Sequence, residues 1–310
     1  SACLVGSEMC IRDRYYSAAV SAIEKSGEER LESTSGEHLR NLVAELFRKD
    51  PFAHAIVYGG DGSVYEAVNG IMGSGAAATA SFSVFPAGSG NDFSAFANDK
   101  AGFKKAELNK IDLISVSRGG KRDYFANMMN IGFDCAVVKE TYTLKKKPFL
   151  KGPAAYIAGV LKVLAVKKTI PAKIKLSGVV SLDKKAPQED IVEEKNILLT
   201  ACANGRYCGG GFNAASLAML NDGLMDVLVV NDVSRAKFIS IVGNYKKGDY
   251  ISEDGSMMSS FKNVIDYCKC RRMEIVGPEM ICLDGEIIET GREEAVVAEV
   301  HPGAVWFAAI

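Results

Sequence analysis

The sequence predicts an α/β protein in two parts: an N-terminal three-layer α/β domain with a mostly parallel sheet, followed by a mainly antiparallel β-sandwich domain. Three observations lead to this fold class. Over about residues 15–100, apolar patterns of helical spacing alternate with short apolar strands, as in a parallel sheet covered by helices. Beyond residue 108 short strands dominate, which is typical of antiparallel architecture. The 310 residues, 48% of them hydrophobic, can bury a core in each part.

The domain boundaries follow from the change of pattern near residue 120. We expect residues 15–120 to form the first domain and residues 121–290 the second. The C-terminal segment, about residues 291–310, is expected to return to the first domain. Residues 1–14 stand apart from both.

The run from Leu4 to Asp13 resembles the conceptual translation of a sequencing-library transposon adapter. We therefore treat residues 1–14 as an adapter artefact and exclude them from functional argument. A natural strand at residues 2–5 is the less favoured alternative. On the adapter interpretation, the genuine first strand of the sheet and the loop after it have been lost.

The first domain begins with two amphipathic helices and continues with two strand–turn–helix units. Helical spacing covers residues 15–25 and 39–47. Ser35 is the expected N-cap of the second helix, and Pro51 closes it. The elements expected next are strand 53–57, a glycine turn, helix 64–72, strand 81–85, a second glycine turn and a helix through Phe93 and Phe96.

The second domain begins with a hairpin and continues as a run of strands. Strands 111–116 and 124–127 flank a turn that contains Gly119 and Gly120. One helix, through residues 156–164, interrupts the pattern. The strands expected after it are residues 172–176, 197–203, 224–230, 272–276, 280–283, 295–300 and 304–309.

Composition excludes several classes of function. A formal net charge of -1 gives no global attraction to nucleic acid. No apolar run reaches the roughly 18 residues of a membrane-spanning helix, and no secretory signal pattern opens the chain. Eight cysteines in apolar contexts and only three histidines indicate reduced, buried thiols in a cytoplasmic protein.

Both strand–turn–helix units place a glycine-rich turn at the end of the strand. Glycines permit positive φ and lack a Cβ, so backbone N–H groups can converge on an anion at the positive end of the following helix. The carboxyl ends of neighbouring parallel strands lie at one edge of a sheet, so both turns should face one ligand. We interpret them as a phosphate cradle. The turns are Tyr58-Gly59-Gly60-Asp61-Gly62-Ser63 and Pro86-Ala87-Gly88-Ser89-Gly90-Asn91-Asp92.

A bare carboxylate inside the first turn would repel phosphate. A cation between them would remove the repulsion, so we expect Asp61 to face Mg²⁺ or the acceptor. The alternative is that Asp61 only caps the helix from Ser63. Asp92, in the second turn, is expected to orient its own loop by local hydrogen bonds.

Further motifs follow the two turns in a fixed order. Together they resemble the diacylglycerol kinase catalytic domain family, soluble bacterial lipid kinases that include sphingoid-base kinases, from about residue 15 to the C-terminus. Serine at positions 63 and 89 replaces the usual threonine and keeps the hydroxyl, and Ser216 replaces a frequent proline. The family's first strand and its asparagine-proline-glycine loop are not visible. The further motifs are Glu66 with Asn69-Gly70, Ile111-Asp112-Leu113, Asn130-Ile131-Gly132-Phe133-Asp134, Asn204-Gly205-Arg206-Tyr207-Cys208-Gly209-Gly210-Gly211, Asp222-Gly223-Leu224-Met225-Asp226 and Leu283-Asp284-Gly285-Glu286.

The resemblance implies an ATP- and Mg²⁺-dependent lipid kinase that phosphorylates a primary hydroxyl, with diacylglycerol as the first candidate acceptor and phosphatidic acid as product. It implies Asp61 and Glu286 as catalytic residues, Glu286 being the general base for the lipid hydroxyl. Asp222 resembles the family residue that helps bind a structural Mg²⁺, a plain Asp-Gly turn being the alternative. The residues expected to bind the nucleotide are Gly59, Gly60, Gly62, Ser63, Glu66, Gly88, Ser89, Gly90 and Asn91.

A lipid kinase must reach a membrane, and one basic segment is a candidate contact. Lysines over residues 145–151 surround Phe149 and Leu150, and Lys162, Lys167 and Lys168 continue the charge. Such lysines could rest on an anionic leaflet, each contributing about 1 kcal/mol. The alternative is a solvated charged face. We expect a cytoplasmic protein in peripheral contact with the membrane, no nucleic-acid partner, and a homodimer as an alternative to a monomer.

Other functions stay open. A sphingoid base or another lipid alcohol is an alternative acceptor. NAD kinases and phosphofructokinases share the first glycine turn, although the second turn and residues 204–211 argue against them. A truncated or non-catalytic nucleotide-binding protein is an alternative of a different class, because loss of the first strand would expose a sheet edge.

Overall fold

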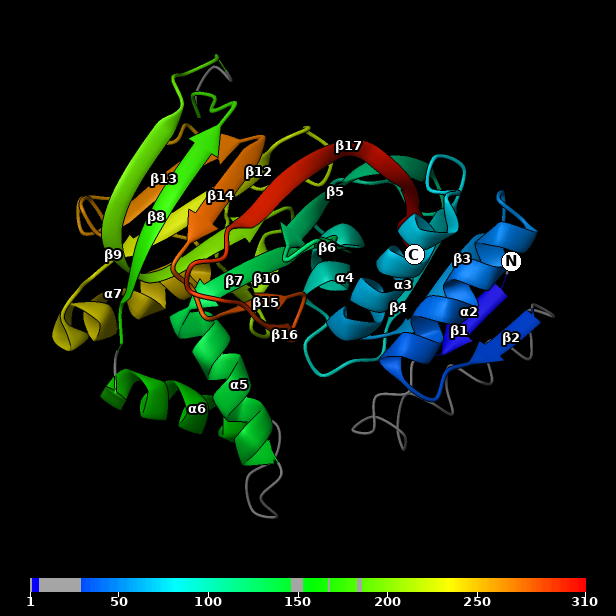
Figure 1. Ribbon diagram of the computed structural model, residues 1–310, viewed down its shortest axis with the longest axis horizontal. Helices are drawn as coiled ribbons and strands as arrows, with labels where there is room; N and C mark the ends of the chain where they lie inside the picture. Colours follow the sequence, from blue (N-terminus) through cyan, green and yellow to red (C-terminus); the bar gives the residue numbers. More distant parts are fainter. Residues whose placement is uncertain (1, 6–28, 146–152, 167, 183–185) are drawn as a thin grey trace.

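The computed structural model of the chain describes residues 2–5, 29–145, 153–166, 168–182 and 186–310 (Figure 1). The helix predicted over residues 15–25 lies outside these ranges. Most of the lysine-rich segment also lies outside them.

The first part of the structure is built on parallel strands. β1 (Ala2–Val5) pairs in parallel with both β2 (Glu29–Glu32) and β3 (His54–Gly59), and β3 pairs in parallel with β4 (Ser81–Pro86). The expectation that the first strand is lost is therefore wrong for the fold. Residues 2–5 are a strand, because an extended apolar segment supplies the backbone partners that the edge of β3 requires.

Helices α2 (Gly36–Lys49) and α3 (Asp61–Ser74) pack against each other beside these strands. The side chain of Ser35 accepts a hydrogen bond from the His38 N–H at 3.1 Å, which confirms the predicted N-cap. The two helices approach closely at Gly70, where a Cβ would lie 2.6 Å from the Arg40 carbonyl oxygen. Only glycine permits this contact.

The second part is antiparallel. From one edge its strands follow the order β16–β15–β7–β9–β8–β14–β17, and every neighbouring pair in this row is antiparallel. β12 pairs with β9 and β13, and the β5–β6 hairpin pairs with β17. The strand bounds are β5 (Leu108–Arg118), β6 (Lys121–Phe125), β7 (Met128–Gly132), β8 (Ile170–Ser177), β9 (Ile191–Ala203), β10 (Tyr207–Cys208), β11 (Phe212–Asn213), β12 (Met225–Asn231), β13 (Ile265–Cys270), β14 (Arg272–Val276), β15 (Met280–Leu283), β16 (Glu286–Glu289) and β17 (Val296–Ala308).

The last strand joins the two parts. β17 pairs with β14 and β5 in antiparallel fashion and with β4 in parallel at Trp306 and Phe307. Figure 1 shows it arching from the second part into the first. The predicted return of the C-terminus is confirmed. The two strands predicted over residues 295–300 and 304–309 are one strand, with a register shift between His301 and Val305.

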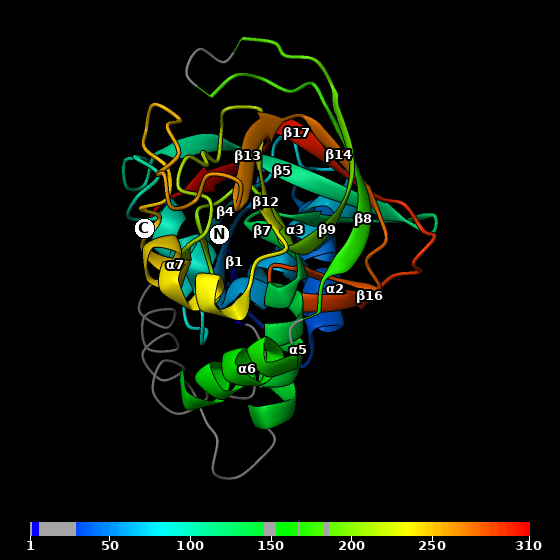
Figure 2. The same ribbon diagram turned by 90° about the vertical axis from the view of Figure 1, so that its left-hand side faces the viewer.

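Three helices, not one, belong to the second part within the described residues: α5 (Phe133–Lys145), α6 (Pro153–Val166) and α7 (Arg235–Lys247). Only α6 was predicted. The ends of α7 were visible in the sequence, since the Ser234 side chain caps it and Gly248 ends it with φ 80°. Figures 1 and 2 show α5 and α6 side by side, projecting from the strands. No helix in the described residues is long and apolar enough to span a bilayer.

Candidate active site between the two parts

The two glycine turns meet at the ends of adjacent strands. Gly59 of β3 stands opposite Pro86 of β4, and α3 begins directly after the first turn. A Cβ on Gly88 would collide with the Cα of Gly60. Because the backbones touch, the turns form one surface, as the sequence predicts, and Gly88 must lack a side chain.

Asp61 connects the two turns. Its carboxylate accepts hydrogen bonds from the backbone N–H groups of Asp92 at 3.1 Å and Phe93 at 3.0 Å. These are the first residues of α4 (Asp92–Ala97). The alternative interpretation was that Asp61 caps the helix that follows its own turn. Its carboxylate instead caps α4, the helix that follows the other turn.

Asp92 connects the turns to the second part. Its carboxylate accepts hydrogen bonds from the N–H groups of Gly210 at 2.9 Å and Gly211 at 2.8 Å. The expectation of local hydrogen bonds is wrong, because the partners lie 118 and 119 residues away. The run of three glycines was the available signal: Gly209, Gly210 and Gly211 are exposed and all have positive φ.

Asp284 lies in the turn between β15 and β16 and supports the same region. It is 4% exposed, and its carboxylate accepts hydrogen bonds from the N–H groups of Ala126, Asn127 and Met128 at 2.7–3.2 Å. The turn is tight, since Asp284 has φ 47° and Gly285 has φ 97°. Asp284 thereby fixes the turn that carries the predicted base, Glu286.

These three carboxylates, Asp61, Asp92 and Asp284, form what we call the cleft cluster. Burial, together with the negative charges of Asp92 and Asp284, raises the pKa of Asp61 to about 7. Burial also raises the pKa of Asp92 and raises that of Asp284 to about 7. Such shifts mark a place where negative charge lacks compensation and where a bound cation would be stabilised.

Glu286 is the first residue of β16 and is partly exposed. The hydroxyl of Tyr142, on α5, donates a hydrogen bond to the Gly285 carbonyl oxygen at 3.1 Å. The predicted base therefore stands two residues after buried Asp284, on a turn that Tyr142 of α5 contacts.

The other predicted phosphate-binding residues divide into exposed and internally bonded groups. Ser89 and Gly90 are exposed, whereas Ser63 is buried against Gly59. The Asn91 amide is used within its turn: Oδ1 accepts from the Gly88 N–H at 2.7 Å, and Nδ2 donates to the Gly88 carbonyl at 2.8 Å. Asn91 thus shapes the turn by holding both backbone groups of Gly88.

Glu66 forms an ion pair with a basic side chain of its own domain. Its carboxylate accepts from Arg40 Nε at 2.6 Å, which joins α3 to α2. Arg40 also lies 3.5 Å from Asp123, which pairs with Arg118 at 2.8 Å. These contacts give Glu66 a structural partner, and no contact in the described structure directs it at the glycine turns.

Asp222, the predicted Mg²⁺ ligand, lies apart from the glycine turns in a buried ion pair with Lys269 at 3.0 Å. Within the described residues, no three His, Cys, Asp or Glu side chains are grouped so as to hold a metal ion. The donor set around Asp222 therefore does not fit the implied divalent cation.

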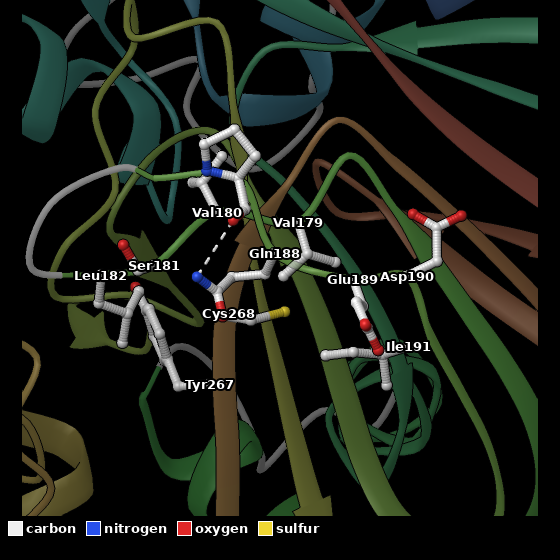
Figure 3. Close-up of a pocket in the computed structure, with 11 residues that line it drawn as sticks. Val179, Val180, Ser181, Leu182, Gln188, Glu189, Asp190, Ile191, Tyr267 and Cys268 are labelled. Atoms are coloured by element: carbon white, nitrogen blue, oxygen red, sulfur yellow. Dashed lines mark hydrogen bonds between the residues drawn. The ribbon is translucent and has the colours of Figure 1, made fainter.

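A pocket of about 700 Å³ lies elsewhere, near the ends of β8, β9 and β13 (Figure 3). None of the predicted site residues lines it. Its walls carry both polar and apolar side chains, and Gln188 Nε2 donates to the Pro187 carbonyl at 3.2 Å. We therefore place the candidate active site at the glycine turns and not in this pocket.

The fold and the paired glycine turns define a two-part α/β protein in which both turns lie at the carboxyl ends of adjacent parallel strands. The diacylglycerol kinase catalytic domain family matches residues 12–118, and the YegS C-terminal NAD kinase beta sandwich-like domain matches residues 127–308. The chain belongs to the family of proteins in which these two domains follow one another.

Curated relatives agree with this assignment. The chain is 29% identical over 214 residues to a protein of Shewanella frigidimarina named "Probable lipid kinase YegS-like", covering 66% of this chain and 62% of the relative. A protein of the same name from Stenotrophomonas maltophilia is 31% identical over 160 residues, covering 49% and 47%. The chain thus spans about half to three fifths of the length of these relatives.

A crystal structure described as a diacylglycerol kinase from Bacillus anthracis strain Sterne superposes with a TM-score of 0.63 and 18% identity. The superposition covers 100% of this chain and 97% of that one. At this identity the likeness establishes the fold alone.

Proposed function

We propose that this protein is a lipid kinase, which transfers the γ-phosphate of ATP to the primary hydroxyl of a membrane lipid. Diacylglycerol is the first candidate acceptor, and the product would be phosphatidic acid. The observation that carries the proposal is the chain of contacts Asp61–Asp92–Gly210, which joins both glycine turns to the second part across an acidic cleft. Family membership supports the same class of reaction.

Phosphoryl transfer requires alignment and neutralisation of charge more than covalent participation by the protein. The first turn presents backbone N–H groups at the start of α3, and exposed Ser89 and Gly90 lie in the adjoining turn. We assign Asp61 to the magnesium–nucleotide complex, because its carboxylate lies where the two turns meet and is held by the backbone N–H groups of Asp92 and Phe93. Bound Mg²⁺ would supply positive charge between that carboxylate and the phosphates.

Glu286 serves as the general base in this proposal. The lipid O–H proton passes to the Glu286 carboxylate, the lipid oxygen forms a bond to the γ-phosphorus, and the bond to the β,γ-bridging oxygen breaks to release ADP. Asp284 positions the base, since its three backbone hydrogen bonds fix the turn on which Glu286 stands.

The α5–α6 pair supports contact with a membrane. Leu161 and Val166 of α6 are 62% and 57% exposed, and Tyr142 of α5 donates to the turn before Glu286. Exposed apolar side chains on a projecting helix can enter a lipid interface, and lysines such as Lys162 and Lys168 can rest on anionic headgroups. We therefore propose peripheral binding to an anionic leaflet, with α6 as the contact.

A lipid-panel assay tests the function. The protein is incubated with labelled ATP, Mg²⁺ and vesicles that contain diacylglycerol, a sphingoid base or another lipid alcohol. Label in phosphatidic acid is the expected result. Label only in another lipid would keep the kinase and replace the acceptor.

The second part matches a domain described as NAD kinase-like, so NAD is assayed in parallel, together with fructose 6-phosphate. Phosphorylation of NAD without any lipid product would refute the lipid kinase. Nucleotide binding without turnover of any acceptor would favour the non-catalytic alternative.

A further inference from the structure

A second group of buried carboxylates lies beside β5, the strand whose residues Ile111 and Leu113 pack in the core of the first part while it pairs with β17. Asp222 and Asp226 are joined there by the ammonium of Lys269, at 3.0 Å and 2.8 Å. Lys269 on β13 is the direct cross-strand neighbour of Asp226 on β12, and it is only 4% exposed. Asp112 lies near enough for the charge of Asp222 to raise its pKa. We call Asp112, Asp222, Asp226 and Lys269 the junction cluster.

Every carboxylate oxygen of the junction cluster has a donor. The two oxygens of Asp112 accept from the N–H groups of Gly303 and Gly223, both at 2.7 Å. Asp222 accepts from the Leu224 N–H at 3.2 Å and from Lys269. Asp226 accepts from the Tyr267 hydroxyl and from the same ammonium. Lys269 Nζ thus occupies the position between Asp222 and Asp226 in which a shared cation would lie, and backbone N–H or hydroxyl groups donate to the remaining oxygens.

The ammonium also excludes a cation by charge. A divalent ion bound to Asp222 would stand next to Lys269 Nζ in a site almost closed to water, where like charges repel strongly. The carboxylates of Asp226 and Asp222 raise the pKa of Lys269 against the effect of burial, so the ammonium stays charged. The magnesium ion that the family resemblance implies at Asp222 does not fit this arrangement.

We propose that the ammonium of Lys269 takes the place of a structural divalent cation at the junction between the two parts. The protein is then held together at this point by its own side chain and needs no metal ion there. This inference does not rest on the proposed lipid kinase function, because it concerns folding stability and metal content.

The junction cluster also reaches the candidate active site through backbone contacts. The carbonyl oxygen of Asp112 accepts from Asn204 Nδ2 at 2.8 Å, and the same amide donates to the Ala126 carbonyl at 2.8 Å. The Ala126 N–H in turn donates to Asp284.

The test compares thermal unfolding of the nucleotide-free protein in EDTA and in millimolar Mg²⁺ or Ca²⁺. The expected result is no stoichiometric metal in the wild type after dialysis and the same response of the Tm to Mg²⁺ or Ca²⁺ in wild type and Asp222→Asn. Asp222→Asn should lower the Tm equally in all three solutions. A wild-type Tm that rises with Mg²⁺, together with loss of that rise in Asp222→Asn, would overturn the proposal.

Lys269→Met gives a second, independent result. The variant removes the ammonium that lies between Asp222 and Asp226, so its Tm should fall by roughly 5 °C or more in EDTA. Added Mg²⁺ or Ca²⁺ should restore part of the loss, because the positive charge that excludes a cation is gone. Lys173→Met is the matched control, since Lys173 is an exposed lysine paired with Glu194 at 3.0 Å, and it should leave the Tm nearly unchanged.

A Lys269→Met protein as stable as the wild type would contradict the proposal. If this variant fails to fold, the wild-type and Asp222→Asn comparison decides alone.

Discussion

The cleft cluster and the junction cluster each gather three aspartates, and they differ in what opposes the negative charge. In the junction cluster one buried ammonium lies between two carboxylates, and hydrogen-bond donors occupy all remaining oxygens. In the cleft cluster only backbone N–H groups oppose the charge, and no Lys or Arg of the described chain pairs with Asp61, Asp92 or Asp284. A cluster that contains its own counter-ion stabilises the fold, whereas a cluster without one can be stabilised by a bound cation.

The largest expected effect is on catalysis and comes from the cleft. Asp61→Ala should lower lipid phosphorylation about 10³-fold, because it removes the carboxylate proposed to face the Mg²⁺ of the nucleotide complex. Glu286→Gln should lower it about 10²–10⁴-fold through loss of the base. Both variants are assayed with labelled ATP and checked for folding by circular dichroism. Full activity in either correctly folded variant would remove that residue from the mechanism.

Substitutions in the junction cluster should lower folding stability more than substitutions in the cleft cluster do. Asp226→Asn leaves the cleft intact but breaks a buried ion pair, so the free energy of unfolding should fall by about 3 kcal/mol. Asp61→Asn, the matched change in the cleft, should alter it by no more than about 1 kcal/mol. Urea unfolding of both variants measures this contrast. Equal losses would show that the two clusters do not differ in the way we describe.

Acidity tests the uncompensated charge of the cleft cluster. Burial raises the pKa of Asp61 and Asp284 to about 7, so the folded state binds these protons more tightly than the unfolded chain does. Their contribution to stability is therefore fully present below the unfolded pKa near 4 and is lost as the pH rises through about 7. Measured in EDTA, the Tm gained between about pH 8 and pH 5 should be smaller by a few degrees in Asp61→Asn. Parallel curves for wild type and variant would contradict the shift at Asp61.

The smallest expected effect comes from the loop at residues 209–211, whose N–H groups donate hydrogen bonds to Asp92. Gly210 has φ 81°, so Gly210→Ala should cost about 1 kcal/mol and weaken ATP binding a few-fold as the loop moves. Gly243→Ala is the control, because Gly243 lies within α7 and a Cβ there meets nothing within 4 Å. That change should stabilise the protein by about 0.5–1 kcal/mol. Isothermal titration with a non-hydrolysable ATP analogue and thermal unfolding measure both variants, and equal ATP affinity for Gly210→Ala and wild type would separate the loop from nucleotide binding.

Local patterns in the sequence predicted the elements that local interactions stabilise. The Ser35 cap, the strands that end at Gly59 and Pro86, and the glycine turns after them all follow from contacts within a few residues. The order of motifs was sufficient to indicate the family and the sides of the cleft. The helices α5 and α7 were missed, and the strand at residues 2–5 was only the less favoured alternative, because neighbouring strands and packing, more than local pattern, decide their structure.

Tertiary structure alone decided the partner of each aspartate. The sequence placed Asp61 and Asp92 at one sheet edge, because parallel strands end together, but it gave no sign that Asp92 binds a loop 118 residues away. It also assigned Asp222 to a metal, while the register of β12 against β13 brings Lys269 to that carboxylate from 47 residues along the chain. The sign of the charge on each side chain is known from the sequence. Charge compensation depends on which strands pair, and that is set by the burial of the whole sheet.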